Sequence, residues 1–205
     1  RTVMLDALEP AVASSFERAI DRLRAAGFEV AAVDLPALSD AASLQRGGGL
    51  SAAESWAWHR HRLAERQAQY DPRVALRIRR GESMNAADYI DLLRERSEWI
   101  ERMGAALAPY DAMLSPTVPI VAPPIAPLEA SDDAFFATNA LLLRNPSLVN
   151  LLDGCALSLP CHRDGDWPVG LMVWAPALCD DRVLSLSLAI GRALAPLRHA
   201  TRSGA

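Results

Sequence analysis

The sequence contains no lysine: all 21 of its basic residues, spread over 205 positions, are arginine. A chain without Lys cannot itself supply a Lys base, a Lys Schiff base or the Lys of a phosphate-binding loop. Basic residues are not in surplus either, because 25 acidic residues give a formal charge of −4. Proteins that bind nucleic acid electrostatically normally carry a basic face. We therefore expect neither Lys-dependent chemistry nor direct nucleic-acid binding from these residues.

Cysteine and long apolar segments are also scarce. Three Cys are an odd number and too few for a secreted scaffold held by disulfides, and they favour free thiols in a reducing compartment. No stretch reaches the roughly 18 apolar residues of a membrane-spanning helix, and the N-terminus lacks a signal-peptide pattern. We expect a cytoplasmic protein without membrane contact. The first residue is Arg rather than Met, so we also expect a processed product or a fragment.

What is present suffices for a large core, because 51% of the residues are hydrophobic. The order of apolar patterns, with strands and helices alternating, predicts an α/β fold. Lacking any linker or repeat, the chain is predicted to form a single domain over 1–205, with a frayed tail from 196 to 205. The expected strands cover 2–5, 28–35, 112–114, 156–159 and 169–175. The expected helices cover 10–26, with Gly27 as the stop, and 51–69, 72–80, 85–107, 135–143 and 180–194. Ser51 with Glu54 has the spacing of a capping box, and Asn85 is predicted to cap the helix that it begins, with Asp88 in the first turn.

Catalytic and metal-binding patterns are incomplete. No G-x-S-x-G elbow surrounds any Ser, and Ser158 falls in a strand predicted to be buried. His59 and His61 are two apart on a predicted helix, which separates them by about 200° around its axis; they cannot share one ion, although His61 and Glu65 could. The run of Gly at 47–49 lacks the Lys that a phosphate loop requires. The residues alone therefore predict no catalytic residue, no metal site and no cofactor.

One ordered set of segments stands out. The segments are 110–119 (YDAMLSPTVP), 150–160 (NLLDGCALSLP), 167–172 (WPVGLM) and 180–184 (DDRVL). In order and spacing they resemble the C-terminal half of the amidase signature family. That pattern has an acidic residue, an apolar pair and P-T-x-P-x-x-A-P, then N…A-x-S-x-P, then P-V-G-L, then an acidic start to a final helix. The first hundred residues look like the family's middle region, so the resemblance covers about residues 1–196.

The resemblance implies part of an α/β/α sandwich around a mixed central sheet, and hydrolysis or transfer of a carboxamide nitrogen. Family members use a Ser-cisSer-Lys triad, in which the Lys activates a bridging Ser that takes the proton from the nucleophilic Ser. An acyl-enzyme results, and water or another nucleophile resolves it. The triad lies N-terminal to the matched region, so the chain alone is expected to be inactive. No cofactor is implied.

The resemblance also suggests where substrate binds, and on that basis we nominate Thr117, Pro119, Asn150, Asp153 and Cys155 as residues of the pocket wall. Many members have Gly and Pro where this chain has Asp153 and Cys155, so the substrate of no one subfamily carries over. The competing interpretation is that the prolines and Asn150 only shape loops and turns.

The expected partners are a small amide substrate and either the missing N-terminal half or a second copy of the chain. Two alternatives to an amidase stay open. One is a non-catalytic or complementing module, and the other is a fragment of the A subunit of a tRNA-dependent amidotransferase.

Overall fold

The computed structural model describes residues 2–198, with side chains to residue 195. These residues divide into two compact units, each of which is described by itself. The first unit comprises the chain up to Leu38 and from Met103 onward, and the second is Ser39–Arg102. The single domain predicted for 1–205 stays a prediction.

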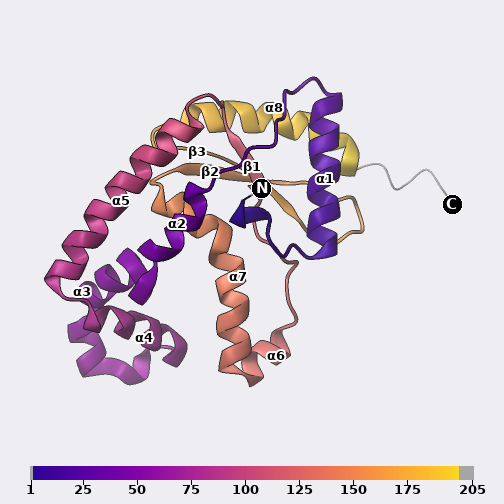
Figure 1. Cartoon of the computed structure of the whole chain (residues 1–205). Coiled ribbons are helices and arrows are strands. Elements are labelled where there is room, and N and C mark those ends of the chain that lie inside the picture. Colours follow the sequence, from indigo (N-terminus) through magenta and orange to yellow (C-terminus); the bar gives the residue numbers. More distant parts are fainter. Residues whose placement is uncertain (1, 199–205) are drawn as a thin grey trace. The chain divides into compact units, whose positions relative to one another are not determined.

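A three-stranded antiparallel sheet forms the centre of the first unit (Figure 1). Its strands are β1 (Met113–Pro116), β2 (Cys155–Pro160) and β3 (Gly170–Ala175), in the order β1-β3-β2. Together with the surrounding helices they confirm the predicted α/β class. Every pairing among the described residues is antiparallel, so the parallel pairs of a mixed sheet are not among these three strands.

Two helices cover one face of this sheet, which we call the α1/α8 face. They are α1 (Pro10–Ala25), which begins at the Pro and ends before Gly27 as predicted, and α8 (Asp180–Arg198). The core between them and the sheet consists of apolar side chains from α1, β3 and α8: Val12, Ala19, Leu23, Leu171, Val173, Val183, Ile190 and Leu194. Burying this many aliphatic side chains is the main stabilising contribution in the unit.

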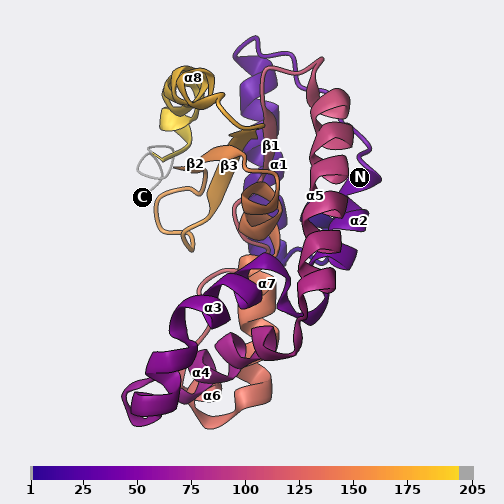
Figure 2. The same cartoon turned by 90° about the vertical axis from the view of Figure 1, so that its left-hand side faces the viewer.

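The other face of the sheet, which we call the opposite face, carries Met172 and Trp174, both buried. The helix α7 (Asp132–Leu151) lies on this side of the sheet (Figures 1 and 2). It is longer than the helix predicted over 135–143, because Ser131 caps its first turn and Pro146 is accommodated inside it. A short helix, α6 (Ile125–Ala130), precedes it.

Two predicted strands are absent. Residues 2–5 form a 3-10 turn (Val3–Leu5) that buries Met4. Residues 28–35 join no ladder of the described sheet; instead Phe28 and Val30 pack against the α1/α8 core. Apolar alternation predicts an extended backbone, but a strand also needs a neighbour with which to pair.

The predicted frayed tail covers residues 196–205. Residues 199–205 lie outside the described residues. Before them, α8 continues to Arg198 instead of ending near Pro196.

The second unit is helical and includes α3 (Gly49–Arg66), α4 (Pro72–Arg79) and the first part of α5 (Ala86–Leu107) (Figure 2). The helix α2 (Ala37–Leu44) begins at its boundary with the first unit. Short 3-10 turns connect the helices, at Arg46–Gly48, Gln67–Gln69 and Arg80–Ser83. No helix in the described part of the chain is both long and apolar enough to cross a bilayer.

Two helix caps are predicted in this unit, at Asn85 and at Ser51 with Glu54, and only the first is present. Asn85 and Asp88 exchange side-chain to backbone hydrogen bonds of 3.0 and 3.1 Å, which is the reciprocal cap that starts α5. The predicted capping box at Ser51 and Glu54 is wrong, because α3 already begins at Gly49. The positive φ of 100° at Gly48 turns the chain into the helix two residues early.

Candidate functional site

Three of the segments that carry the family resemblance meet at one place on the sheet. Thr117 follows β1, Ser158 lies in β2 and Gly170 begins β3. The hydroxyls Thr117 Oγ1 and Ser158 Oγ are 2.6 Å apart, and the Thr117 N–H donates to the Gly170 carbonyl at 2.8 Å. Residues far apart in the sequence thus form one polar cluster, which we call the hydroxyl pair.

Gly170 leaves the space that the hydroxyl pair occupies. A Cβ at this position would overlap Ser158 Oγ and lie 2.6 Å from Thr117 Oγ1. Ordinary side-chain contacts are about 3.5–4.0 Å. Only Gly at 170 therefore allows the two hydroxyls to bond each other directly above the strand.

The hydroxyl pair lies on the exposed part of the opposite face. Side chains of β2 alternate, so that Leu157 and Leu159 are half-buried against the α1/α8 core while Ala156, Ser158 and Pro160 are exposed. Each hydroxyl has one O–H donor and two acceptor lone pairs. One donor is used within the pair. The other O–H and the remaining lone pairs can bind a neutral polar group such as a carboxamide, which has both an acceptor and donors.

The loop after Thr117 is held in place by Glu9. The Glu9 N–H donates to the Pro119 carbonyl, and its carboxylate Oε2 accepts from the Val121 N–H, both at 2.9 Å. Prolines at 116, 119, 123 and 124 cannot donate hydrogen bonds and restrict the backbone. The two hydrogen bonds to Glu9 take the place of the ladder hydrogen bonds that a neighbouring strand would supply. They hold the loop in one conformation.

Asn145 fixes the start of the same loop. Its side chain is fully buried, and Nδ2 donates to the carbonyls of Pro116 at 2.8 Å and Met4 at 3.0 Å. Arg144 adds bonds to the carbonyls of Met4 and Asp6 at 3.3 and 2.7 Å. Burial lowers the pKa of the Arg144 guanidinium, and the nearby Asp6 opposes that shift. Both side chains tie α7 to the chain around β1.

The five nominated residues do not all gather at the hydroxyl pair. Thr117 is a member of the pair, and Pro119 is buried in the loop beside it. Asn150 and Asp153 are exposed at the end of α7, where Asp153 takes a left-handed conformation with a φ of 54°. Glycine is the usual residue in that conformation and Asp is one of the few others that adopt it, which accounts physically for the Gly that many family members have there.

Cys155 lies on a different part of the sheet from Thr117. It pairs with Ala175, whereas Thr117 bonds to Gly170 five residues along β3, roughly 17 Å away. Its side chain also packs on the α1/α8 core rather than on the opposite face. Burial raises the pKa of the Cys155 thiol, and the negative charge of Asp180 raises it further. This thiol is therefore set apart from the hydroxyl pair in both position and chemistry.

Sequence reasoning missed Ser158 and Gly170 as members of the site. The interpretation of Ser158 as a buried strand residue is wrong, because its side chain is exposed. Residues 155–160 alternate Cys, Leu and Leu with Ala, Ser and Pro, and this period of two indicates one apolar and one small or polar face. That signal could have placed Ser158 on the surface. No local pattern marks Glu9 or Asn145, whose partners lie more than 25 residues away.

Metal ligands do not gather anywhere in the part of the chain that the structure describes. It contains no group of three or more His, Cys, Asp or Glu side chains placed to hold an ion. The chemistry available at the hydroxyl pair is hydrogen bonding to a neutral polar group.

Comparisons with known proteins show which family the chain belongs to. The amidase family profile matches residues 1–184. A 2-amino-5-chloromuconic acid deaminase of Comamonas testosteroni is 31% identical over 190 residues, which cover 90% of this chain and 40% of the deaminase. The A subunit of the glutamyl-tRNA(Gln) amidotransferase of Mycolicibacterium paratuberculosis is 30% identical, and the match covers 94% of this chain and 43% of that protein.

Solved structures show the same fold. A crystal structure of an amidase superimposes with a TM-score of 0.73 at 28% identity, over 95% of this chain and 44% of that chain. Allophanate hydrolase of Kluyveromyces lactis superimposes with a TM-score of 0.80 at 22% identity, over 96% of this chain and 31% of that chain. The chain spans about two-fifths of the length of the relatives that it matches in sequence, and it belongs to the amidase signature family.

Proposed function

We propose that this chain is the C-terminal part of an amidase that hydrolyses a carboxamide to a carboxylate and ammonia or an amine. Its family membership supports the reaction class. The observation that carries the proposal is the hydroxyl pair, where three motif segments of an amidase family member converge on an exposed group suited to an amide. In this proposal the hydroxyl pair forms part of the wall of the substrate pocket.

The hydroxyl pair would position the amide rather than attack it. The free O–H of the pair donates to the substrate carbonyl oxygen, and hydroxyl lone pairs accept from the amide N–H. Because Glu9 and Asn145 fix the loop beside Thr117, these groups are in place before substrate arrives. Groups held ready in this way cost little entropy on binding.

The attacking residues come from outside these 205 residues in this proposal. The Ser-cisSer-Lys mechanism needs a Lys, and this chain has none. The nucleophilic Ser forms a bond to the carbonyl carbon, the C–N bond breaks, and the nitrogen leaves with the proton passed through the bridging Ser. Water then cleaves the acyl ester and releases the carboxylate. The chain alone would thus be inactive.

The partner would be a segment carrying the triad. Ala156, Ser158 and Pro160 leave one side of β2 exposed, and β2 is an edge of the described sheet. Edge strands with exposed faces favour association with further structure. We also propose a cytoplasmic location, supported by the three free thiols of Cys155, Cys161 and Cys179.

The test is ammonia release from small aryl and aliphatic amides by the 205-residue chain and by the product of the whole reading frame that contains it. We expect turnover only from the longer product, and we expect S158A and T117V to lower its kcat/KM. The matched control is S185A, an exposed Ser on α8. Robust turnover by the 205-residue chain that survives replacement of every Ser would refute the mechanism.

A second candidate is the A subunit of a glutamyl-tRNA(Gln) amidotransferase. The observation in its favour is the 30% identity to several such proteins over more than 90% of this chain. The two candidates differ in their amide donor. The same ammonia assay with glutamine as the substrate separates them: preference for glutamine, increased by mischarged tRNA and partner proteins, favours the amidotransferase. The remaining alternative is a module that complements another chain without catalysis. It predicts no ammonia release in any of these assays.

A further inference from the structure

The second unit contains a basic segment that the amide site does not use. Between residues 46 and 80 there are eight Arg and three acidic residues, a net charge of +5 in a chain whose total is −4. The Arg residues are 46, 60, 62, 66, 73, 77, 79 and 80. This charge lies on α3, α4 and the turns around them. Positive potential that is concentrated in this way attracts anions.

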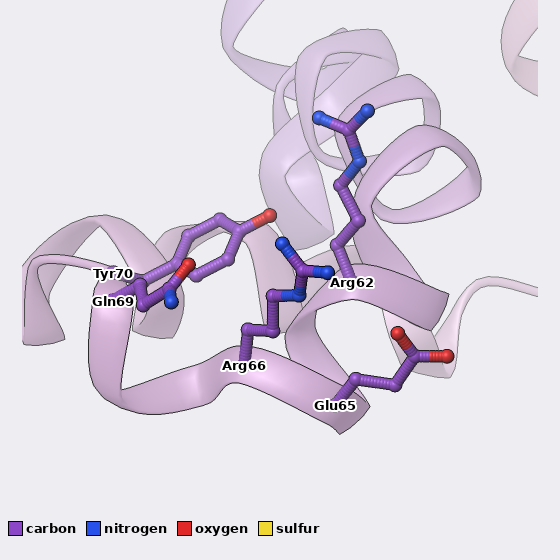
Figure 3. Close-up of a pocket in the computed structure, with 5 residues that line it drawn as sticks. All are labelled: Arg62, Glu65, Arg66, Gln69 and Tyr70. Carbon is purple, nitrogen blue, oxygen red and sulfur yellow. The ribbon is translucent and has the colours of Figure 1, made fainter.

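A pocket of about 520 Å³ opens in this segment, at the end of α3 and the turn that follows. Its lining consists of Arg62, Glu65, Arg66, Gln69 and Tyr70, which Figure 3 shows as sticks. Arg62 lies near the end of α3, and Arg66 ends that helix, where its φ of −138° and ψ of 36° depart from helical geometry. The volume falls in the range of pockets that bind small molecules.

The Tyr70 side chain is positioned in this pocket by His59. His59 Nδ1 lies 2.9 Å from Tyr70 Oη, and the two rings meet edge to face with centroids 5.7 Å apart. Tyr70 is half-buried, whereas the two Arg and Gln69 are exposed. The pocket therefore combines one positioned hydroxyl with two exposed guanidinium groups and a carboxamide.

Neither guanidinium is neutralised within the described residues. Arg62 and Arg66 form no ion pair there, even though Glu65 lies between them in the sequence. In Figure 3 the Glu65 carboxylate points away from Tyr70, while the Arg66 guanidinium extends towards the Tyr70 side. By contrast Arg94 pairs with Asp91 at 3.0 Å in the same unit. Two exposed like charges at one pocket repel each other, and a bound anion would offset that repulsion.

We propose that this pocket binds a small doubly charged oxyanion, either a phosphate group or a dicarboxylate. Arg62 and Arg66 would each donate paired N–H bonds to its oxygens, which is the geometry that suits carboxylate and phosphate. The Gln69 amide would add a neutral donor, and so would the Tyr70 hydroxyl in the tautomer in which the His59 Nδ1–H donates to Tyr70 Oη. The proposal does not depend on amide hydrolysis, because all of its residues belong to the second unit.

The experiment titrates the full 205-residue chain with inorganic phosphate and, separately, with succinate, at constant ionic strength. Calorimetry gives the dissociation constant, and the Arg Nε–H and Tyr70 NMR signals locate the site. We expect saturable binding of at least one probe. R62Q/R66Q should weaken it by at least about tenfold, since two charge-assisted hydrogen-bonding groups are lost. Y70F, which keeps the ring, should weaken it less.

R60Q is the matched control, because Arg60 is exposed on the same helix but does not line the pocket. It removes one charge of the same kind, and we expect a change below about twofold at constant ionic strength. Circular dichroism checks that each variant stays folded. Stronger binding of phosphate or of succinate identifies the class of ligand. Absence of saturable binding by both probes, or an equal loss in R60Q and R62Q/R66Q, would overturn the proposal.

Discussion

Thr117 Oγ1 and Ser158 Oγ lie 2.6 Å apart although the two residues are 41 positions apart in the sequence. Their contact depends on Gly170, the first residue of the strand between them. The contact therefore requires that β1, β2 and β3 pair in the observed register. It also joins the P-T-x-P, A-x-S-x-P and P-V-G-L segments at one point of the sheet.

Replacing Gly170 with Ala should destabilise the first unit. The new Cβ would overlap Ser158 Oγ and crowd Thr117 Oγ1, and overpacking of this kind costs about 1–3 kcal/mol. Urea unfolding measures the change. Adding S158A to G170A should restore part of the loss because it removes the overlapping oxygen.

The control for G170A is Gly104 in α5. A Cβ there meets no atom within 4 Å, and Ala in a helix is more stable than Gly by about 0.5–1 kcal/mol. We expect G104A to be neutral or stabilising. An equal loss in G170A and G104A, or no rescue by S158A, would argue against the crowding.

Asn145 should matter more for stability than the nominated Asn150. N145A removes the side-chain donor of the Pro116 carbonyl and one of the two side-chain donors of the Met4 carbonyl, at a cost of about 1–3 kcal/mol. Asn150 is exposed at the end of the same helix, so N150A should change the unfolding free energy by less than about 0.5 kcal/mol. Thermal or urea unfolding of the two variants provides the comparison, and a smaller effect at Asn145 would contradict the assignment.

Glu9 should control the local stability of the loop after Thr117. E9A removes the acceptor of the Val121 N–H. We expect exchange of the Val121 amide to become about fivefold faster, which corresponds to a hydrogen bond of about 1 kcal/mol. Hydrogen exchange followed by NMR measures this rate. E17A, an exposed Glu on α1, is the control and should leave the rate unchanged.

The buried thiol of Cys161 should make stability depend on alkaline pH. Burial raises its pKa from the usual 9.0 to about 11, against the opposing charge of Arg18. The folded state therefore keeps a proton that the unfolded state loses, and this contribution is complete below pH 9 and disappears as the pH rises through 11. We expect the unfolding free energy to fall by about 1–3 kcal/mol over that window. Urea unfolding at several pH values should show a smaller decrease in C161A, and an identical pH slope in the two proteins would contradict the shift.

How much of this the sequence predicts depends on whether a feature is local. The start of α1 at Pro10, the cap formed by Asn85 and the Val169–Ala175 strand prediction follow from patterns within a few residues. The pairing of strands into a ladder does not follow from such local patterns. Residues 28–35 therefore look like a strand in the sequence but join no described ladder.

The candidate site shows the same division. The family motifs nominated Thr117 and Pro119, and their role in substrate binding stays a prediction. Ser158 was missed because its strand was taken as buried on both faces, when only one face of an edge strand packs on a core. Glu9 and Asn145 hold the loop after β1 through hydrogen bonds to residues far away in the sequence, and no local spacing predicts such contacts.

The most direct test of the central claim is ammonia release from amides by the product of the complete reading frame, compared with its S158A and S185A variants. The account predicts that the complete product hydrolyses an amide, that the 205-residue chain does not, and that S158A lowers kcat/KM by about tenfold, the worth of a hydrogen bond or two, while S185A has no effect. Equal activity of S158A and S185A would contradict a role for the hydroxyl pair. Hydrolysis by the 205-residue chain alone would contradict the placement of the catalytic residues outside it.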